Sequence, residues 1–514
     1  MHLEKITQRY LDLFPTDRSK NTMQRTVPNI LSCLVDPVKF DLPKLLYFNE
    51  QLSEELGLGK IENHKDEDFL AAQNLPKNIR PFATAYAGHQ FGQWAGQLGD
   101  GRAIYAGEIL QKNGKFQELQ WKGAGATPFS RAGDGRAVLR STIREFLMSE
   151  ALHHLKIPTT RGLSISLTGE QVIRDVLYNG NPKPEPGAVM LRTAESFLRF
   201  GHFEWFSAQR DYETLEKLGL FCIENYYPEI NLNDDNKYKK FFEQILERTA
   251  NLMVDWLRVG FVHGVMNTDN LSIIGLTIDY GPFSMLDEYD TSFTPNTTDL
   301  PGRRYAFGEQ GKIAQWNLWK LANALFPLIE DADYLTEKLE YFNDYFNQKS
   351  DEMLCKKFGF ENMKEDYAAF FEEWQLLMED LVLDYTLFFT ALEKWKPEFE
   401  VKSHFQTCFY KNNSPEEFQK LSTFLKIYDE HISNQNFSEE NRLKLMQENN
   451  PKFVLRNYLL YECIEEVSQG KMEFFNALFL ALQTPYDCDD VSLTKKRPSK
   501  YDNQSGCSML SCSS

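Results

Sequence analysis

The stretch FVHGVMNTDNLSIIGLTIDYGPF, which runs from Phe261 to Phe283, decides how the rest of the chain is interpreted. His263 is followed seven residues later by Asn270, and nine residues after that Asp279 opens an Asp-Tyr-Gly triplet. NTDN and DYGPF are also good turn sequences, so each could be an ordinary loop. Their order and spacing favour two neighbouring loops that carry oxygen ligands.

The spacing is similar to that of a protein kinase, in which His-Arg-Asp-Leu-x-x-x-Asn is followed by Asp-Phe-Gly. Asn270 and Asp279 occupy the places of the two magnesium-binding residues, and an amide oxygen and a carboxylate suit Mg²⁺. The kinase base, an aspartate two residues after the histidine, is replaced by Val265. Asp269 is the only carboxylate inside the loop, and it is the candidate for a base in this altered site.

Two glycine-rich segments with embedded arginines precede this stretch. LGDGR contains Gly99, Gly101 and Arg102, and KGAGATPFSRAGDGR repeats the GDGR pattern with Asp134 and Gly135. Such turns let backbone N–H groups approach a phosphate, and an arginine adds a fixed positive fork. One isolated turn of this kind is more often a plain hairpin turn, but two so close together favour a nucleotide site.

Four charged residues between the first glycine-rich segment and Phe261 have competing interpretations. Lys122 ends the strand-like FQELQWK, and Glu145 lies one turn into the helix predicted for STIREFLMSEALHHLK. Glu145 either pairs with Lys122, as in kinases, or forms a capping box with Thr142 at the helix start. Arg192 and Arg199 are seven residues apart and would share one face of a helix if their segment is helical. They would then clamp a phosphate or serve as ordinary surface arginines.

The pattern of the whole chain predicts an α+β protein with a strand-rich part followed by a helical part. RAIYAGEIL and KFQELQWK predict a hairpin around QKNGK, and PTTRGLSISLTGEQVIRD and PGAVMLRTAE also have strand character. YKKFFEQILERTANLMVDWLRVG predicts a long helix that ends at Gly260. We divide the chain into an N-terminal extension that packs on the core (1–80), a strand-rich nucleotide-binding small lobe (81–185), the catalytic core of a large lobe (186–305), a helical C-terminal region (306–485) and a polar, mobile tail (486–514).

Composition excludes several classes of function. The 514 residues are 42% hydrophobic and 25% charged, as in globular proteins, and the net charge of −18 argues against a nucleic-acid partner. No apolar run reaches the ~18 residues that cross a bilayer, and the start, MHLEKITQRYLDLFPTD, lacks a signal-peptide core. We therefore expect a cytoplasmic protein without a membrane partner. The eight cysteines show no CxxC spacing, which excludes a disulfide framework and a zinc site.

Longer segments resemble the selenoprotein O (SelO, or YdiU) family over nearly the whole chain. The segments are YAGHQFGQWAGQLGDGRA, RSTIREFLMSEAL, SFLRFGHFE, HGVMNTDNLSIIGLTIDYGPF and RRYAFGEQ. The resemblance implies a protein-kinase-like two-lobed fold with an N-terminal extension and a largely helical C-terminal region. It implies AMPylation, the transfer of AMP from ATP to Ser, Thr or Tyr hydroxyls of protein substrates, with ATP bound in a flipped orientation and Mg²⁺ or Mn²⁺ as cofactor.

The resemblance also assigns roles to single residues. Asp269 matches the proton acceptor, and Asn270 and Asp279 match the metal ligands. The residues that match nucleotide contacts are Gly99, Gly101, Arg102, Lys122, Glu145, Asp134, Gly135, Arg192, Arg199 and Asp279. The tail departs from the pattern of eukaryotic members that end in Cys-x-x-selenocysteine. Cys512 occupies the place of the selenocysteine, but the place of the motif's cysteine is taken by Met509, and Cys507 comes two residues too early. A regulatory disulfide between Cys507 and Cys512 and two plain thiols remain equal alternatives.

Other activities remain open at this point. A related enzyme would move the γ-phosphate of ATP instead of AMP, and another would use UTP and Mn²⁺ for uridylyl transfer. A protein of a different class, a catalytically dead pseudokinase scaffold, would bind a nucleotide and work through partners. The expected form of the enzyme is a monomer whose partners are ATP and protein substrates.

Overall fold

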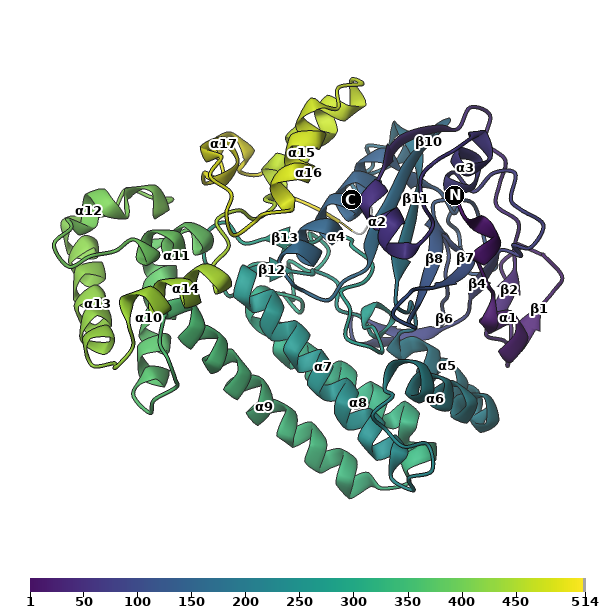
Figure 1. The fold of residues 1–514 in the computed structure, drawn as a ribbon, viewed down its shortest axis with the longest axis horizontal. Helices are drawn as coiled ribbons and strands as arrows, with labels where there is room; N and C mark the ends of the chain where they lie inside the picture. The colour runs from purple at the N-terminus through teal and green to yellow at the C-terminus, as the bar shows by residue number, and fades with distance from the viewer. Residues whose placement is uncertain (512–514) are drawn as a thin grey trace.

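A nine-stranded sheet forms one side of the molecule within residues 1–511, the part of the chain that this computed structural model describes (Figure 1). Its strand order is β1-β2-β4-β7-β8-β11-β10-β3, with β9 paired to β11. The strands of this sheet are β1 (Thr16–Asp17), β2 (Ser32–Leu34), β3 (Lys44–Phe48), β4 (Phe82–Thr84), β7 (Ala103–Leu110), β8 (Phe116–Lys122), β9 (Ala137–Val138), β10 (Arg161–Arg174) and β11 (Lys183–Ala194). Two further strand pairs are β5 (Ala87–Gln90) with β6 (Gln93–Gln97) and β12 (Phe261–Val262) with β13 (Ser284–Met285).

The predicted hairpin is present as β7 and β8. The Gln111 N–H donates to the Lys115 carbonyl at 2.8 Å, and Gly114 supplies the positive φ of 83° that the turn needs. On β8, successive side chains point to opposite faces. Trp121 therefore faces α3 (His64–Leu70), where its indole N–H donates to the Phe69 carbonyl at 2.8 Å, while Lys122 faces the other side. The two other predicted strands are β10 and β11.

The N-terminal segment contributes strands to both ends of this sheet. At one edge β3 pairs with β10. At the opposite edge β2 pairs with β4, and β1 pairs with β2. Covering both edges satisfies backbone groups that would otherwise be open to another strand. Residues before 80 are thus part of the sheet and do not only pack on it.

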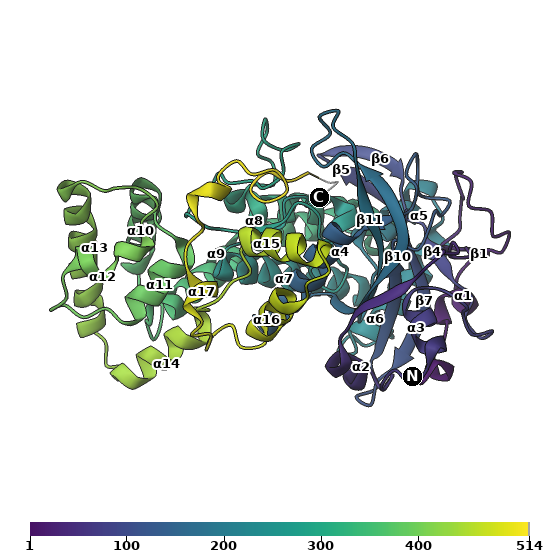
Figure 2. The same cartoon turned by 90° about the horizontal axis from the view of Figure 1, so that it is seen from above.

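The helix predicted for STIREFLMSEALHHLK is α4 (Leu139–His154), which lies against β10 and β11. Ile143, Phe146 and Leu147 are fully buried on it. The C-terminal helices α15 (Asn457–Ser468) and α16 (Glu473–Leu482) return from the far end of the chain and contact α4, as Figures 1 and 2 show in yellow. This return joins the C-terminal region to the strand-rich part.

The middle of the molecule consists of three long helices that contact one another, α7, α8 and α9 (Figure 1). The helix α7 ends where the sequence predicted, because Gly260 with φ of 76° caps it. Helices α10, α11 and α13 enclose a second apolar core at the end of the molecule away from the sheet (Figure 2). The remaining helices are α1 (Arg9–Leu13), α2 (Glu50–Leu56), α5 (Phe200–Gln209), α6 (Tyr212–Tyr226), α7 (Lys237–Val259), α8 (Gln310–Ile329), α9 (Ala332–Phe358), α10 (Tyr367–Leu381), α11 (Tyr385–Glu393), α12 (Val401–His404), α13 (Pro415–Ser433), α14 (Glu439–Asn449) and α17 (Val491–Thr494).

The C-terminal tail makes specific contacts up to residue 511. The Thr297 N–H donates to the Leu510 carbonyl at 2.8 Å, and Leu510 is fully buried. Cys507 is also buried, and burial raises the pKa of its thiol to about 12. Cys512 lies outside the described residues, so a disulfide between these two cysteines stays a prediction. No helix in the described chain is long and apolar enough to cross a membrane.

Arg456 ties the returning C-terminal helices to the segment that follows β13 and to α11, and its removal tests this fold. Its guanidinium contacts Asp287 at 2.7 Å and Asp384, which precedes α11, at 2.9 Å, and Arg456 and Asp384 are almost fully buried. We expect Arg456→Ala to destabilise the protein by about 3–5 kcal/mol, because it leaves the buried carboxylate of Asp384 without its counter-charge, whereas Asp287 keeps Arg497 at 2.8 Å. Thermal unfolding measures this effect.

Lys500→Ala is the control, because Lys500 is exposed and its pair with Glu462 is 3.6 Å long. We expect no measurable shift of the unfolding midpoint from it. Equal midpoints for the two variants would contradict the role of Arg456.

Candidate active site

A cleft of about 730 Å³ collects most of the residues that the sequence singled out. Ten of the twelve predicted site residues line it, and the other two, Glu145 and Arg199, are buried beside it. The lining members are Gly99, Gly101, Arg102, Lys122, Asp134, Gly135, Arg192, Asp269, Asn270 and Asp279. Segments up to 180 residues apart in the chain therefore meet at one site.

Asp279 is the anionic centre of this cleft. Its Oδ1 accepts a hydrogen bond from Arg192 at 2.7 Å, and its Oδ2 accepts one from Arg199. The Lys122 ammonium lies 3.6 Å from Oδ1. Burial alone would raise the pKa of Asp279, but Arg199, Arg192 and Lys122 hold it well below its ordinary value. Asp279 also has a left-handed backbone with φ of 59°, an uncommon conformation that aspartate tolerates and that recurs at functional sites.

Lys122 and Glu145 form an ion pair, as one of the two interpretations predicted. Glu145 also accepts a hydrogen bond from Arg192 at 2.7 Å. The capping-box interpretation is wrong, because α4 begins at Leu139 and Thr142 already lies inside it. The Thr142 hydroxyl donates instead to the Val138 carbonyl at 2.9 Å. Glu145 is thus free of the helix start and turns toward the cleft.

The expectation that Arg192 and Arg199 share a helix face is also wrong. Arg192 lies on β11, opposite Gln120 of β8, and Arg199 is the residue before α5. The strand persists to Ala194 because β11 pairs with β8 along this part, so the helix begins only at Phe200. The two guanidiniums nevertheless meet, since both contact Asp279.

Three residues that hold these arginines were missed by the sequence reasoning. The Gln120 side-chain oxygen accepts two hydrogen bonds from Arg192, at 2.9 and 2.6 Å. The Tyr86 ring centroid lies 4.6 Å from the Arg199 guanidinium, and Asp100 lies 4.0 Å from Arg199 Nη2. Asp100 stands inside the quoted LGDGR motif, so its position was a usable signal. Tyr86 opens the quoted segment YAGHQFGQWAGQLGDGRA and carried a similar signal, whereas Gln120 carried none, because the pairing of β8 with β11 brings it here.

Asp269 carries a carboxylate oxygen that is available for chemistry. It lies in the short 3₁₀ turn Thr268–Asn270, and its Oδ2 accepts a hydrogen bond from Gln90 at 3.1 Å. Its Oδ1 is buried and has no hydrogen-bond donor within the described residues. Burial raises the pKa of Asp269 to about 6. A carboxylate with this pKa is suited to accept a proton near neutral pH.

The β5–β6 hairpin positions the loop that carries Asp269. The His89 N–H donates to the Thr268 hydroxyl at 2.7 Å. Gly88 lies so close to Asp269 that a Cβ at this position would be 2.8 Å from Oδ1, so only glycine permits this approach. The segment AYAGHQFGQW contributed to the family resemblance, but sequence reasoning assigned no role to Gly88 or Gln90.

His263 forms the frame of the loop that carries Asp269 and Asn270. Its Nε2–H donates to the Ile278 carbonyl at 2.9 Å, and its Nδ1 accepts from the Val265 N–H at 3.3 Å. Burial lowers the pKa of His263, which keeps the ring in the neutral form that this bonding pattern requires. The Ile278 contact ties the loop to the residue directly before Asp279.

Asn270 and Asp279 offer the kinds of atom that a hard divalent cation binds. The Asn270 side-chain N–H donates to the Val265 carbonyl at 2.9 Å, and in the described chain nothing donates to its amide oxygen. Nowhere in residues 1–511 do three or more His, Cys, Asp or Glu side chains form a cluster that could hold a metal. A cation here would therefore need phosphate or water oxygens beside these two residues, which is the usual situation of Mg²⁺.

The glycine loops form the outer wall of the cleft. Gly99 has φ of 138°, and a side chain there would overlap the Phe129 ring. The Thr127 hydroxyl donates to the Asp100 carbonyl at 2.7 Å, so the second loop supports the first. In the second loop, Arg174 holds both carboxylate oxygens of Asp134, at 2.7 and 2.8 Å. In the first loop, Arg102 makes no ion pair within the described residues. The guanidinium of Arg102 can therefore receive a phosphate in the cleft.

Glu145→Gln tests the charge balance of this cluster. We expect it to destabilise the protein by about 1–3 kcal/mol, because Lys122 and Arg192 both lose a buried carboxylate partner while the side-chain shape is kept. Thermal unfolding of the variant and the wild type measures the change. The matched control is Glu185→Gln, whose partner Arg140 lies 2.9 Å away at a more exposed position. A shift no larger than that of the control would contradict the prediction.

Comparisons with known proteins identify the family to which this chain belongs. The family model described as "Protein adenylyltransferase SelO" matches residues 20–483. The chain is 44% identical to the protein nucleotidyltransferase YdiU of Cytophaga hutchinsonii, covering 100% of this chain and 99% of the relative. It is 42% identical to the YdiU of Flavobacterium johnsoniae, with 99% of each chain covered, and 41% identical to that of Nitrosospira multiformis, with 99% and 96% covered. The chain therefore belongs to the SelO (YdiU) family of protein nucleotidyltransferases.

Proposed function

We propose that this enzyme transfers AMP from ATP to Ser, Thr or Tyr hydroxyls of target proteins in a kinase-like two-lobed site, with ATP in the flipped orientation. The hydroxyl oxygen attacks the α-phosphorus, the bond to the β-phosphate oxygen breaks, and pyrophosphate leaves. The hydroxyl proton passes to Asp269. The product is a phosphodiester between the target side chain and AMP.

One observation carries this proposal: Asp269 lines the cleft that collects the glycine loops and the cations, and one of its carboxylate oxygens has no hydrogen bond in the described chain. That oxygen, Oδ1, is buried beside Gly88, and Gln90 holds the other carboxylate oxygen at 3.1 Å. Because Oδ1 has no donor, it can accept the proton of an incoming hydroxyl without breaking an existing bond. This supports an acid–base role for Asp269 where a kinase would use the residue at 265.

The cations of the cleft suit a triphosphate. Lys122, Arg192 and Arg199 come from three different elements and already converge on one carboxylate, Asp279. Fixed cations of this kind stabilise charge that develops on a leaving pyrophosphate without reorganisation during the reaction. In the flipped orientation, the β- and γ-phosphates would lie toward Arg192 and Arg199, and the α-phosphate toward Asp269.

Asn270 and Asp279 would hold Mg²⁺ or Mn²⁺ together with the phosphates. When bound, such a cation neutralises phosphate charge and so makes the leaving group better. Within the chain, Asp279 would have to share its oxygens with Arg192 and Arg199, which occupy them in this structure. Glu145, which pairs with Lys122, also accepts a hydrogen bond from Arg192 and so holds one of these two arginines.

Labelled nucleotides test the reaction type. We expect protein incubated with ATP to retain label from the α-phosphate and none from the γ-phosphate. Label retained only from the γ-position would make the enzyme a phosphotransferase and would overturn the proposal. Running the same assay with α-labelled UTP shows whether uridylyl transfer is preferred.

Asp279→Ala separates an enzyme from a scaffold. We expect transfer to fall by about 10²-fold or more, because the arginine cluster and the metal position lose their shared carboxylate. Asp235→Ala, at an exposed aspartate outside the cleft lining, is the control and should keep full activity. Nucleotide binding without transfer in the wild type would favour the scaffold.

The pH dependence tests the base. Because burial raises the pKa of Asp269 to about 6, the carboxylate is protonated below that pH and cannot accept the hydroxyl proton. We expect the transfer rate to rise about tenfold per pH unit up to pH ~6 and then to level off. Asp269→Asn should lower the rate by about 10²–10⁴-fold and remove this rise, while ATP binding persists. An unchanged pH profile in Asp269→Asn would exclude Asp269 as the base.

A further inference from the structure

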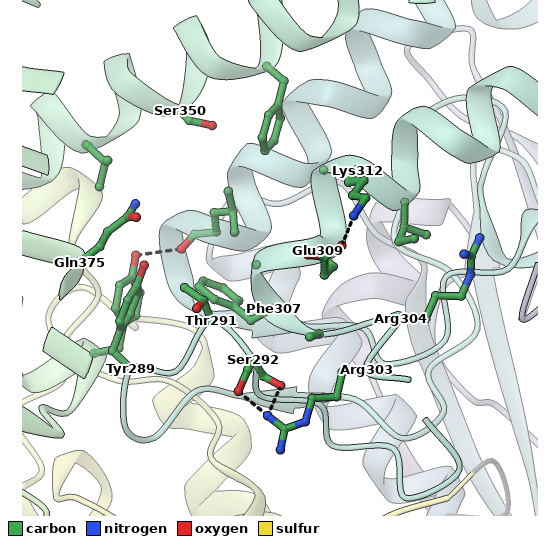
Figure 3. A pocket seen from close by; sticks show the side chains of 18 of the residues that line it. Tyr289, Thr291, Ser292, Arg303, Arg304, Phe307, Glu309, Lys312, Ser350 and Gln375 are labelled. Carbon is green, nitrogen blue, oxygen red and sulfur yellow. Dashed lines mark hydrogen bonds and ion pairs between the residues drawn. The ribbon is translucent and has the colours of Figure 1, made fainter. Parts of the chain in front are cut away.

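A second cavity, of about 820 Å³, lies outside the proposed nucleotide cleft. Figure 3 shows it between the segment that contains Tyr289, Ser292 and Phe307 and the helices that carry Ser350 and Gln375. These helices are α9 and α10, which belong to the helical C-terminal region. Nothing in the proposed transfer reaction uses this cavity, so its chemistry needs a separate explanation.

The interior of this cavity is aromatic but contains polar atoms without partners. Tyr289, Phe307 and Tyr385 provide ring surface, and Trp374 is 1% exposed. The indole N–H of Trp374 makes no hydrogen bond within the described residues, nor does the hydroxyl of Ser350. Both atoms are themselves buried, so the rings and not these two groups describe the ligand, and they favour one that is apolar in the main.

The rim of the cavity is positive, although the chain carries a net charge of −18. Arg303 and Arg304 have no carboxylate within ion-pair distance among residues 1–511, and the Nε of Arg304 has no hydrogen-bond partner there. Lys312 pairs with Glu309 at 3.1 Å, so these two largely cancel. Arg303 is exposed and only its contacts with Ser292 hold it. The two arginines favour an acidic partner.

The cavity is connected to the active site through one short segment. Tyr305 lies between the rim arginines and Phe307, and its hydroxyl donates to the Asn267 side-chain oxygen at 2.6 Å. The Phe91 N–H donates to the same oxygen at 3.1 Å. Phe91 and Asn267 both line the nucleotide cleft, and Asn267 is two residues before Asp269. The segment 303–307 therefore contacts both the cavity and the loop that carries Asp269.

We propose that this cavity is a docking site for the protein substrate, which inserts one aromatic or large aliphatic side chain flanked by acidic residues. The ring surface would hold the inserted side chain, and the arginines would contact the acidic residues. The proposal rests on the proposed function, because it assigns the segment to a protein that is modified at the neighbouring cleft.

A defined peptide tests this docking site. The probe is a short fluorescein-labelled peptide with one tyrosine between glutamates and a serine acceptor, and its anisotropy is followed with the full chain in the absence of ATP. Control peptides replace the tyrosine by alanine or the glutamates by lysines. We expect saturable binding of the probe and binding at least about tenfold weaker for both controls.

Three variants address the cavity without touching the nucleotide cleft. Ser350→Leu fills the cavity from α9, Arg303→Glu reverses the rim charge, and Trp374→Phe removes the N–H but keeps a ring. We expect the first two to weaken probe binding at least about fivefold and Trp374→Phe to weaken it less, with the binding of a fluorescent ATP analogue unchanged in all three. Because the Ser350 hydroxyl has no partner in the described chain, its removal should not lower the unfolding midpoint, whereas Trp374→Phe should lower it, since the smaller ring leaves buried space unfilled.

The outcomes separate docking from catalysis. With α-labelled ATP, Ser350→Leu should raise KM for the probe peptide and leave kcat unchanged. Failure of the wild type to bind the probe, or equal binding by Ser350→Leu and Arg303→Glu, would overturn the docking site. If the wild type binds the probe, the variants bind it more weakly and the wild type transfers no AMP, the docking site is supported and the proposed function is rejected.

Discussion

The convergence of three cations on the Asp279 carboxylate is the interaction on which the site depends. Lys122 comes from β8, Arg192 from β11 and Arg199 from the residue before α5, so the Asp279 side chain connects the sheet to the start of a helix. Buried charges are stable only when they are paired. The position of every one of these groups is therefore constrained by the others, and the cleft forms between them.

Glu145 makes this arrangement possible by adding a second carboxylate on the side of α4. Glu145 pairs with both Lys122 and Arg192, so two carboxylates and not Asp279 alone balance the charges of these cations. The hydrogen bonds from Arg192 to Gln120 fix the guanidinium plane. A nucleotide triphosphate that enters such a site meets donors already held in place, which is the main requirement for phosphoryl-type transfer. Arg199 also donates to the backbone carbonyl of Asp269 at 2.9 Å, while one carboxylate oxygen of Asp269 has no hydrogen bond in the described chain.

The regular elements were predictable because they depend on local patterns. Gly260 ends α7 since its left-handed conformation caps a helix, and the hairpin around Gly114 follows from a short turn between two alternating segments. Arg192 and Arg199 were expected on one face of a helix, because they are seven residues apart. This expectation failed because the pairing of β11 with β8 keeps the backbone of Arg192 extended. The capping box failed because the helix starts three residues before Thr142. In both cases tertiary contacts decided between local alternatives.

The sequence by itself determined the α+β composition, the presence of the main strands and helices, and the residues that carry charge or glycine in the candidate site. Membership in the SelO family was also evident from its motifs. Only the tertiary structure decided which partners those residues have, because hydrogen bonds such as Gln90 to Asp269 join positions 179 residues apart. The same holds for the second cavity, whose walls come from α9, α10 and the segment before α8. Local periodicity cannot encode such contacts, since they arise when whole elements pack.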